Sequence, residues 1–319
     1  MSVAATWTQL SERGSAWAMR LAIACYRAFG RPVALVIVHL TIAYFFVTDG
    51  RGRRASRAYL RRVHELTGQP SHHPGYWQSF LHYRMFALSI FDRVAFWLGR
   101  GDEFEFVFNG AELFARVIEE GRGAIIVGSH LGSFDSMRLL AHRAGVVVNV
   151  LMFTDHAPLL NSIFHELSPD AEMNVIRADP SSTKTAFTVR SCIERGELVA
   201  ILADRIEPGD RGSVHRTRFL GDAANFPTGA FVLATMFGCP IIHMVGLRRA
   251  NDRYEITAEL LCEATVVARK NRRTHIHGLV ERYAERLEHF CLDSPYQWFN
   301  FYDFWSDESE VVEPVEEAA

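Results

Sequence analysis

The sequence predicts an α/β fold in which helices flank a mostly parallel β-sheet in three layers. From about residue 104 onward, short apolar runs of strand length alternate with stretches of helical periodicity. Glycine stands where four of the helix-like stretches end, at Gly121, Gly145, Gly196 and Gly238. Such alternation favours a parallel sheet covered by helices on both faces. We expect this α/β domain to occupy residues 101–306, after a helical, membrane-associating region (1–100) and before an acidic, disordered tail (307–319).

Composition is that of a globular protein and narrows the functional classes. Of the 319 residues, 49% are hydrophobic and 22% charged, which excludes global disorder. The net charge of -3 gives no reason to expect a nucleic-acid partner. The five cysteines are scattered and form no C-x-x-C pair, so reduced thiols in a cytosolic compartment are expected. The N-terminus lacks the order of regions found in a cleavable signal peptide.

An apolar run at residues 33–47 is interrupted only by His39 and Thr41. As a helix it would cover roughly 22 Å, which is short of the ~30 Å hydrocarbon core of a bilayer. Six arginines follow directly: Arg51, Arg53, Arg54, Arg57, Arg61 and Arg62. This order favours docking on an anionic cytoplasmic leaflet. A buried core helix and a true membrane span stay open, and the arginines could also steer an acidic acyl carrier protein.

The periodicity predicts further elements along the chain. Residues 55–100 are expected to be largely helical and rich in core aromatics. Helices are then expected at 111–120, 136–143, 182–194, 228–237 and 271–291. Strands are expected at 124–127, 146–153, 174–176, 198–202 and 241–245. Polar residues follow each strand, and at one sheet edge we expect His130, Asp155, Arg177, Asp204, Arg205 and Arg248.

His130 stands on the predicted turn between the strand at 124–127 and the next helix, and Asp135 follows five positions later. A neutral histidine can remove a proton from a hydroxyl or amine as that group attacks an acyl carbonyl. A carboxylate on the other ring nitrogen would orient the histidine and stabilise its protonated form, and we expect Asp135 in that role. No G-x-S-x-G nucleophile is present, so the pattern favours direct acyl transfer to an acceptor.

The segment Gly128-Ser129-His130-Leu131-Gly132-Ser133-Phe134-Asp135 resembles the H-x4-D block of the lysophospholipid acyltransferase superfamily. More closely, the chain resembles the lipid A biosynthesis (lauroyl/myristoyl) acyltransferase branch. Supporting blocks in the same order are Ala203-Asp204-Arg205, then Arg218-Phe219-Leu220-Gly221-Asp222, then Phe226-Pro227-Thr228-Gly229-Ala230, and finally Gly238-Cys239-Pro240-Ile241. The resemblance covers roughly residues 20–305.

The resemblance implies that His130 is the general base and that Asp135 orients it. It also implies an acyl carrier protein or coenzyme A thioester as donor, and a location on the cytoplasmic face of the inner membrane. The threonine of Phe226-Pro227-Thr228-Gly229 replaces the glutamate of the glycerolipid branch, which argues against a glycerol-phosphate acceptor. The tail at 295–305 is aromatic where that of the lipid A branch is basic, so an aryl-polyene or amino-acid lipid acceptor stays open.

Other residues are predicted to border the substrates. Arg177 and Arg205 could neutralise a phosphate of the acceptor or of the donor's phosphopantetheine, or could pair with nearby aspartates. Asp204 could position the acceptor hydroxyl, or form a salt bridge with one of those arginines. Ser133 and Phe134 belong to the H-x4-D block. The four residues Phe226, Pro227, Thr228 and Gly229 are expected to turn into a helix whose free N–H groups favour an oxyanion.

No metal or cofactor is expected beyond the acyl thioester that is consumed. His72 and His73 lie together in a loop, but no carboxylate or cysteine stands at a suitable spacing for metal binding. Two other functional classes stay open. The protein could be a catalytically silent membrane-surface protein that holds an acyl chain or carrier protein. It could also be a thioesterase in which water replaces the acceptor.

Overall fold

The computed structural model describes residues 16–152, 174–177, 183–206, 214–250 and 252–306. Asp155 and the predicted acidic tail lie outside these ranges. The helices are α1 (Ala16–Phe29), α2 (Arg31–Thr48), α3 (Gly50–Thr67), α4 (Tyr76–Trp97), α5 (Ala111–Glu119), α6 (Phe134–Arg143), α8 (Thr183–Glu194), α9 (Gly229–Phe237) and α10 (Arg272–Asp293). The strands are β1 (Glu105–Asn109), β2 (Ala124–Gly128), β3 (Val148–Met152), β4 (Asn174–Arg177), β5 (Leu198–Leu202), β6 (Val214–Phe219), β7 (Asp222–Pro227), β8 (Ile241–Arg248) and β9 (Arg253–Cys262).

The main sheet has seven strands in the order β1-β9-β8-β2-β5-β3-β4. Strands β8, β2, β5, β3 and β4 run parallel, whereas β9 is antiparallel to β8. Strand β2 has strands on both sides and all five of its residues are buried, which explains its uninterrupted apolar sequence. The predicted α/β fold with a mostly parallel sheet is therefore confirmed.

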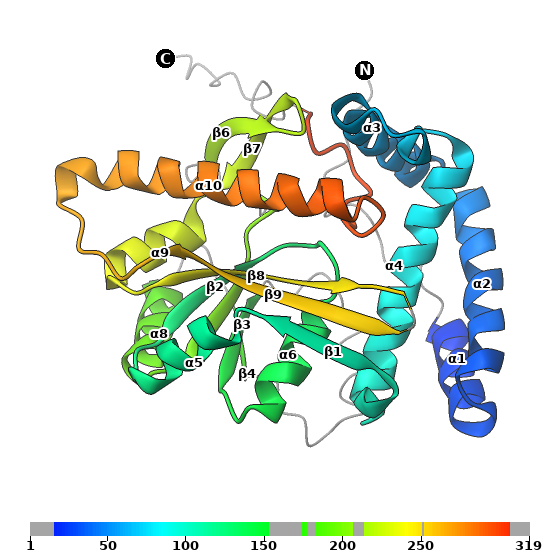
Figure 1. Ribbon diagram of the computed structural model, residues 1–319, viewed down its shortest axis with the longest axis horizontal. Coiled ribbons are helices and arrows are strands. Elements are labelled where there is room, and N and C mark those ends of the chain that lie inside the picture. The colour runs from blue at the N-terminus through cyan, green and yellow to red at the C-terminus, as the bar shows by residue number, and fades with distance from the viewer. Residues whose placement is uncertain (1–15, 153–173, 178–182, 207–213, 251, 307–319) are drawn as a thin grey trace, which may run out of the picture.

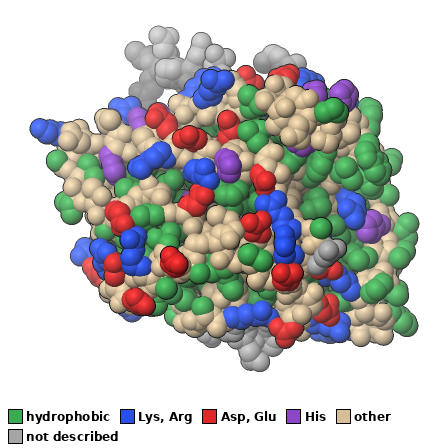
Figure 2. Space-filling model, in the orientation of Figure 1, with side chains coloured by type: hydrophobic (Ala, Val, Ile, Leu, Met, Phe, Trp, Pro, Cys, Tyr) green, Lys and Arg blue, Asp and Glu red, His purple; other side chains and the backbone are tan. Residues whose placement is uncertain are grey.

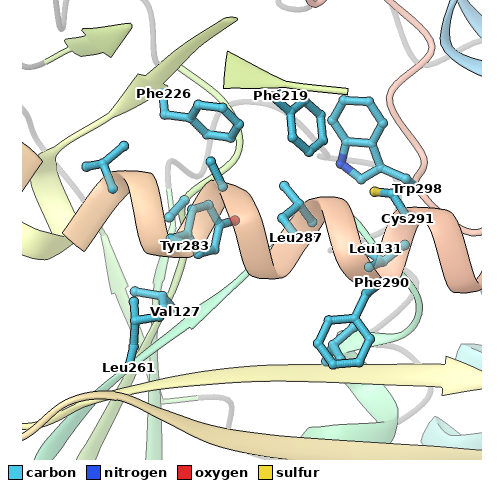
Figure 3. Packing of buried hydrophobic residues seen from close by; sticks show 14 of the residues in the cluster. Val127, Leu131, Phe219, Phe226, Leu261, Tyr283, Leu287, Phe290, Cys291 and Trp298 are labelled. Atoms are coloured by element: carbon cyan, nitrogen blue, oxygen red, sulfur yellow. The ribbon is translucent and has the colours of Figure 1, made fainter. Parts of the chain in front are cut away.

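Helices cover both faces of the sheet, which gives the predicted three layers (Figure 1). Helices α5 and α6 pack on one face, and α8, α9 and α10 pack on the other. The two-stranded hairpin β6–β7 packs on the outer side of α10. Figure 3 shows this layering, with Phe219 and Phe226 of the hairpin on one side of α10 and Val127 and Leu261 of the sheet on the other.

The N-terminal helices form a separate hydrophobic cluster beside the sheet. Helix α4 lies between α2 and the α/β domain, and buried residues of α2 pack toward it. A buried ion network joins the N-terminal helices to the sheet. The Asp92 carboxylate of α4 forms salt bridges with Arg31 of α2 at 2.7 Å and with Arg248 of β8 at 2.8 Å. Arg248 ends β8 at the sheet edge, as predicted. Its guanidinium, however, pairs with Asp92 and so helps to hold α4 against the sheet.

The predicted helices and strands agree with the structure to within a few residues at most of their ends. The structure adds β1, β9 and the hairpin β6–β7, which the sequence did not predict. In β9, which pairs with β8 on one edge and β1 on the other, buried and partly exposed residues alternate. Successive side chains point to opposite faces of the sheet, and one face is more deeply buried than the other.

Candidate active site

His130 lies on a tight turn between β2 and α6. The turn depends on Gly132, whose φ of +73° places it in the left-handed region. A Cβ on Gly132 would lie 2.1 Å from the carbonyl oxygen of Gly246 in β8. The next residue, Ser133, donates its backbone N–H to that same carbonyl at 2.8 Å. The small residues of the predicted motif therefore let the turn pack against β8.

Asp204 holds His130 through both of its carboxylate oxygens. The Nδ1 atom of His130 lies 2.8 Å from Oδ1 of Asp204, and the His130 backbone N–H donates to Oδ2 at 2.9 Å. The carboxylate of Asp204 is fully buried, whereas 28% of the His130 side chain is exposed. A carboxylate only accepts, so Nδ1 carries the proton and the lone pair of Nε2 is available as a base. No described residue forms a hydrogen bond with Nε2.

The segment Gln297–Asn300 forms a wall behind this pair. The indole Nε1–H of Trp298 donates to Oδ2 of Asp204 at 3.0 Å, and the Asn300 amide lies 3.4 Å from the same oxygen. The backbone N–H of Phe299 donates to the His130 carbonyl at 2.8 Å. The wall thus fixes the carboxylate and the backbone of the histidine together.

Burial and charge set the ionisation of the pair. Burial and the nearby Arg205 and Arg93 guanidinium groups lower the pKa of His130, although Asp204 opposes them. Burial alone would raise the pKa of Asp204. Its attraction to His130, the hydrogen bonds that His130 donates and the charge of Arg205 outweigh burial and lower that pKa to about 2. At neutral pH the site therefore holds a carboxylate next to a neutral imidazole.

This ionisation predicts the pH dependence of the reaction. If neutral His130 is the general base, as the sequence predicts, the rate of acyl transfer should fall as pH decreases through its pKa. Because that pKa is lowered from 6.5, the acidic limb of kcat/KM should lie below pH 6.5. A pH–rate profile of the free enzyme measures this limb. A limb at or above pH 6.5 would contradict the assignment of His130 as the buried base.

The prediction that Asp135 contacts the His130 ring is wrong. The structure shows that Asp204, not Asp135, is the hydrogen-bond partner of His130 Nδ1. Asp135 lies in the first turn of α6 and faces α4. Its carboxylate contacts the Arg93 Nε at 2.5 Å and accepts from the indole of Trp97 at 3.2 Å. Asp135 therefore joins the motif helix to α4, and Asp204 occupies the position at Nδ1 that the sequence analysis expected for Asp135.

The two residues before Asp135 have structural contacts. Ser133 is buried, and its hydroxyl accepts from the backbone N–H of Ser136 at 3.2 Å, which caps the start of α6. Phe134 packs against the core between α6 and the sheet. Their predicted contact with substrate stays a prediction.

Arg177 and Arg205, for which the sequence predicted the same role, lie in different parts of the structure. Arg205 donates to the Asn300 side chain at 2.8 Å and to the Phe299 carbonyl at 3.0 Å, so it braces the wall next to His130. Arg177 ends strand β4 at the far edge of the sheet, with β5 and β3 between it and β2. Arg177 is therefore not brought to His130.

Residues 226–229 form the predicted turn into a helix. Phe226 and Pro227 end β7, Thr228 precedes α9, and Gly229 begins it. Helix α9 leads into β8, which is parallel to β2, so its N-terminus lies toward the same sheet edge as His130. The Phe226 ring is fully buried between Phe219 and Tyr283. The oxyanion role of this helix start stays a prediction.

Sequence reasoning missed most of the wall. Gln297 exchanges two side-chain hydrogen bonds with the backbone of Arg248, both at 2.9 Å, which ties the wall to β8. Trp298 and Asn300 contact the Asp204 carboxylate directly. The signal was present as a tryptophan and an asparagine in the aromatic tail, but nothing in the local pattern places that tail beside β2.

Comparison with known families settles the kind of protein. A sequence model of the bacterial lipid A biosynthesis acyltransferases matches residues 8–306. The chain belongs to this family. The lipid A acyltransferase match spans the N-terminal helices, the H-x4-D turn, Asp204 and the wall in a single alignment. Membership supports acyl transfer to a lipid-like acceptor. A comparison with curated proteins gives no match.

Proposed function

We propose that this protein transfers a fatty acyl group from a phosphopantetheine thioester to a hydroxyl group of a lipid A-type acceptor. The donor would be carried by acyl carrier protein or by coenzyme A. The observation that carries the proposal is the His130–Asp204 pair. The His130 side chain is partly exposed, and its Nε2 has no hydrogen-bond partner among the described residues. No described serine or cysteine side chain is hydrogen-bonded to His130, so the acceptor hydroxyl acts as the nucleophile.

In the proposed reaction, Nε2 of His130 removes the proton of the acceptor hydroxyl as its oxygen attacks the thioester carbonyl. Asp204 stabilises the imidazolium that forms. The tetrahedral oxyanion would lie toward the N–H groups at the start of α9 or toward the Arg93 guanidinium. The C–S bond then breaks, and the imidazolium returns its proton to the departing thiolate. This reaction uses no metal and no cofactor other than the thioester.

The aromatic tail does not by itself favour an aromatic acceptor. The Trp298 and Phe304 rings pack edge to face at 4.9 Å, and both are buried against Phe219. The Phe301 ring packs at a tilt against the rings of His82 and Tyr83 of α4. These contacts fill the core beside the site, which explains the aromatic composition without an aryl-polyene substrate. A lipid A-type acceptor is therefore the better proposal.

The proposed location is the cytoplasmic face of the inner membrane, with α2 lying in the interface. Helix α2 is 18 residues long, long and apolar enough to cross a membrane, and only 17% of that window is buried. Its buried residues lie on one face, toward α4. The opposite face exposes an apolar stripe, which lies on the right of Figure 2: Val33, Val36, Leu40, Tyr44 and Val47. A helix packed along the protein with one apolar face outward suits an interfacial position.

The basic helix α3 follows α2 directly, and its arginines fall into two groups. Arg53, Arg57 and Arg62 bond to carbonyl or carboxylate groups within the protein. Arg51, Arg54 and Arg61 are exposed. We propose that these three exposed arginines contact anionic lipid or the acidic carrier protein, because a cluster of exposed positive charge attracts both partners.

Membrane docking predicts the effect of charge on the stripe. Leu40 and Val47 are 68% and 72% exposed, so Leu40→Glu with Val47→Glu should not disturb the core. We expect binding to vesicles of mixed zwitterionic and anionic phospholipid to weaken by roughly tenfold or more, because two apolar side chains that the bilayer would bury are replaced by carboxylates. The matched control is Phe187→Glu on α8, where the side chain is 66% exposed. Equal binding by the stripe variant and the control in co-sedimentation would contradict the proposal.

Mass spectrometry of lipid extracts tests the proposed function in cells. Extracts from cells with and without the intact gene should differ by one acylated species, and its deacylated precursor should accumulate in the deletion. The mass difference gives the acyl chain, and the precursor identifies the acceptor. Extracts in which no acylated species changes would contradict the proposal.

A further inference from the structure

His82 is a fully buried histidine in the second turn of α4 that the proposed reaction does not use. Its Nε2 lies 2.8 Å from the backbone carbonyl oxygen of Trp298. Its Nδ1 lies 3.0 Å from the hydroxyl of Ser56 in α3, and the Ser79 hydroxyl donates to Ser56 at 2.9 Å. Both ring nitrogens are therefore satisfied, and one of them contacts the wall of the site.

The direction of these hydrogen bonds follows from the chemistry of the partners. A carbonyl oxygen only accepts, so Nε2 of His82 carries the proton and donates to Trp298. Nδ1 then accepts from the Ser56 hydroxyl. Burial lowers the pKa of His82 to about 4, although the hydrogen bond to Trp298 opposes this shift, so the ring is neutral at physiological pH. The bond to Trp298 thus involves no charge.

Trp298 is the residue through which His82 reaches the catalytic pair. Its indole donates to Asp204 at 3.0 Å, and the next backbone N–H, of Phe299, donates to the His130 carbonyl. The carbonyl that His82 holds lies between these two contacts along the chain. Fixing that peptide group therefore fixes both the carboxylate and the histidine backbone.

Ring packing leaves little freedom at this point. The His82 and Phe301 ring centroids are 4.5 Å apart, and the His82 and Tyr59 ring centroids are 5.6 Å apart. Tyr59 also contacts the Trp298 indole, with centroids 5.1 Å apart. A planar ring of this size with a donor at Nε2 satisfies both the packing and the hydrogen bond.

We propose that His82 is a positioning residue for the His130–Asp204 pair, acting through the backbone carbonyl of Trp298. The inference rests on the proposed function, because it assigns the effect to acyl transfer. Without the Nε2 donor, the Trp298 indole would hold Asp204 less firmly and Nε2 of His130 would be less well aligned. Small misplacements of this kind lower kcat by up to about a hundredfold.

The test compares His82→Leu, which removes the donor, with His82→Gln, which keeps an N–H near the Nε2 position. We expect His82→Leu to lower kcat by about tenfold to a hundredfold with KM changed by less than about threefold. His82→Gln should recover most of that loss. His243→Leu is the matched control, because His243 of β8 is also buried and forms no hydrogen bond with the wall among the described residues. This variant should retain kcat.

A spectroscopic measurement separates positioning from simple loss of stability. The groups that face His130 are Asp204, Arg205 and Arg93. Because Asp204 raises the pKa of His130 and the two arginines lower it, a looser Asp204 should lower that pKa further. Nitrogen-15 NMR titration of the His130 ring in folded His82→Leu should show this shift, and His82→Gln should not. If His82→Leu does not fold, Ser56→Ala, which removes the hydroxyl donor to Nδ1, takes its place with a smaller shift in the same direction.

The outcomes distinguish this inference from the proposed function. An unchanged His130 titration with unchanged kcat in folded His82→Leu would overturn the positioning role. A kcat loss that merely follows the unfolded fraction, or that is as large in His82→Gln, would also overturn it. If wild-type protein transfers no acyl group but the His130 titration still shifts, the proposed function fails and the positioning contact stands.

Discussion

His130→Ala is expected to lower the rate of acyl transfer by roughly 10²–10⁴-fold, because the variant lacks the base that activates the acceptor hydroxyl. The substitution should leave the fold intact. The side chain is partly exposed, and the backbone bonds of residue 130 to Asp204 and Phe299 do not need the ring.

The rate of product formation from lauroyl-acyl carrier protein and a lipid A precursor measures this loss. His289→Ala is a matched control, because His289 is exposed on α10 and forms no hydrogen bond with the pair among the described residues. A melting temperature close to that of wild type shows that His130→Ala is folded. Wild-type turnover by the folded variant would contradict the role of His130.

Asp204→Asn is expected to produce the second large loss, about 10²–10⁴-fold in kcat. The amide can donate to Nδ1, which favours the tautomer with the proton on Nε2 and removes the basic lone pair from the acceptor side. It also loses the negative charge that stabilises the imidazolium. Comparing Asp204→Asn with Asp135→Asn tests which carboxylate orients His130. The structure indicates Asp204, whereas the H-x4-D pattern indicates Asp135.

The paired comparison has a clear expected order. Asp135→Asn weakens the contacts with Arg93 and Trp97, so it should lower the melting temperature and reduce kcat by less than about tenfold. Both variants need kcat and melting temperature measured under the same conditions. A larger kcat loss in folded Asp135→Asn than in folded Asp204→Asn would return the orienting role to Asp135.

The fold was predictable because its signals are local. Apolar runs bounded by glycine, such as the one that ends at Gly128, define buried strands and the ends of helices. The position of His130 after such a strand was therefore predictable as well. Family resemblance then supplied the order of the blocks. Hairpin β6–β7 and strand β9 were missed because their apolar residues are interspersed with polar ones.

The partner of His130 was not predictable from spacing, because it depends on strand order. Strands β2 and β5 are neighbours, and their register pairs Gly128 with Leu202. His130 and Asp204 each follow two residues later, so they lie side by side at the sheet edge. Sequence reasoning placed both residues at this edge but could not tell which strands are adjacent. The role of His82 was hidden for a similar reason, since its partner Trp298 lies more than two hundred residues away.

The most direct test of the account is a reaction of purified protein with lauroyl-acyl carrier protein, with and without a lipid A precursor in phospholipid vesicles. Thiol release and the mass of the acylated acceptor are measured together for wild type, His130→Ala and Asp204→Asn. The account predicts that wild type forms one acylated acceptor for each thiol released, only when the acceptor is present, and that both variants lose this activity. Thiol release that needs no acceptor would indicate a thioesterase, and thioester binding without release would indicate a silent binding protein. Either result would contradict the account.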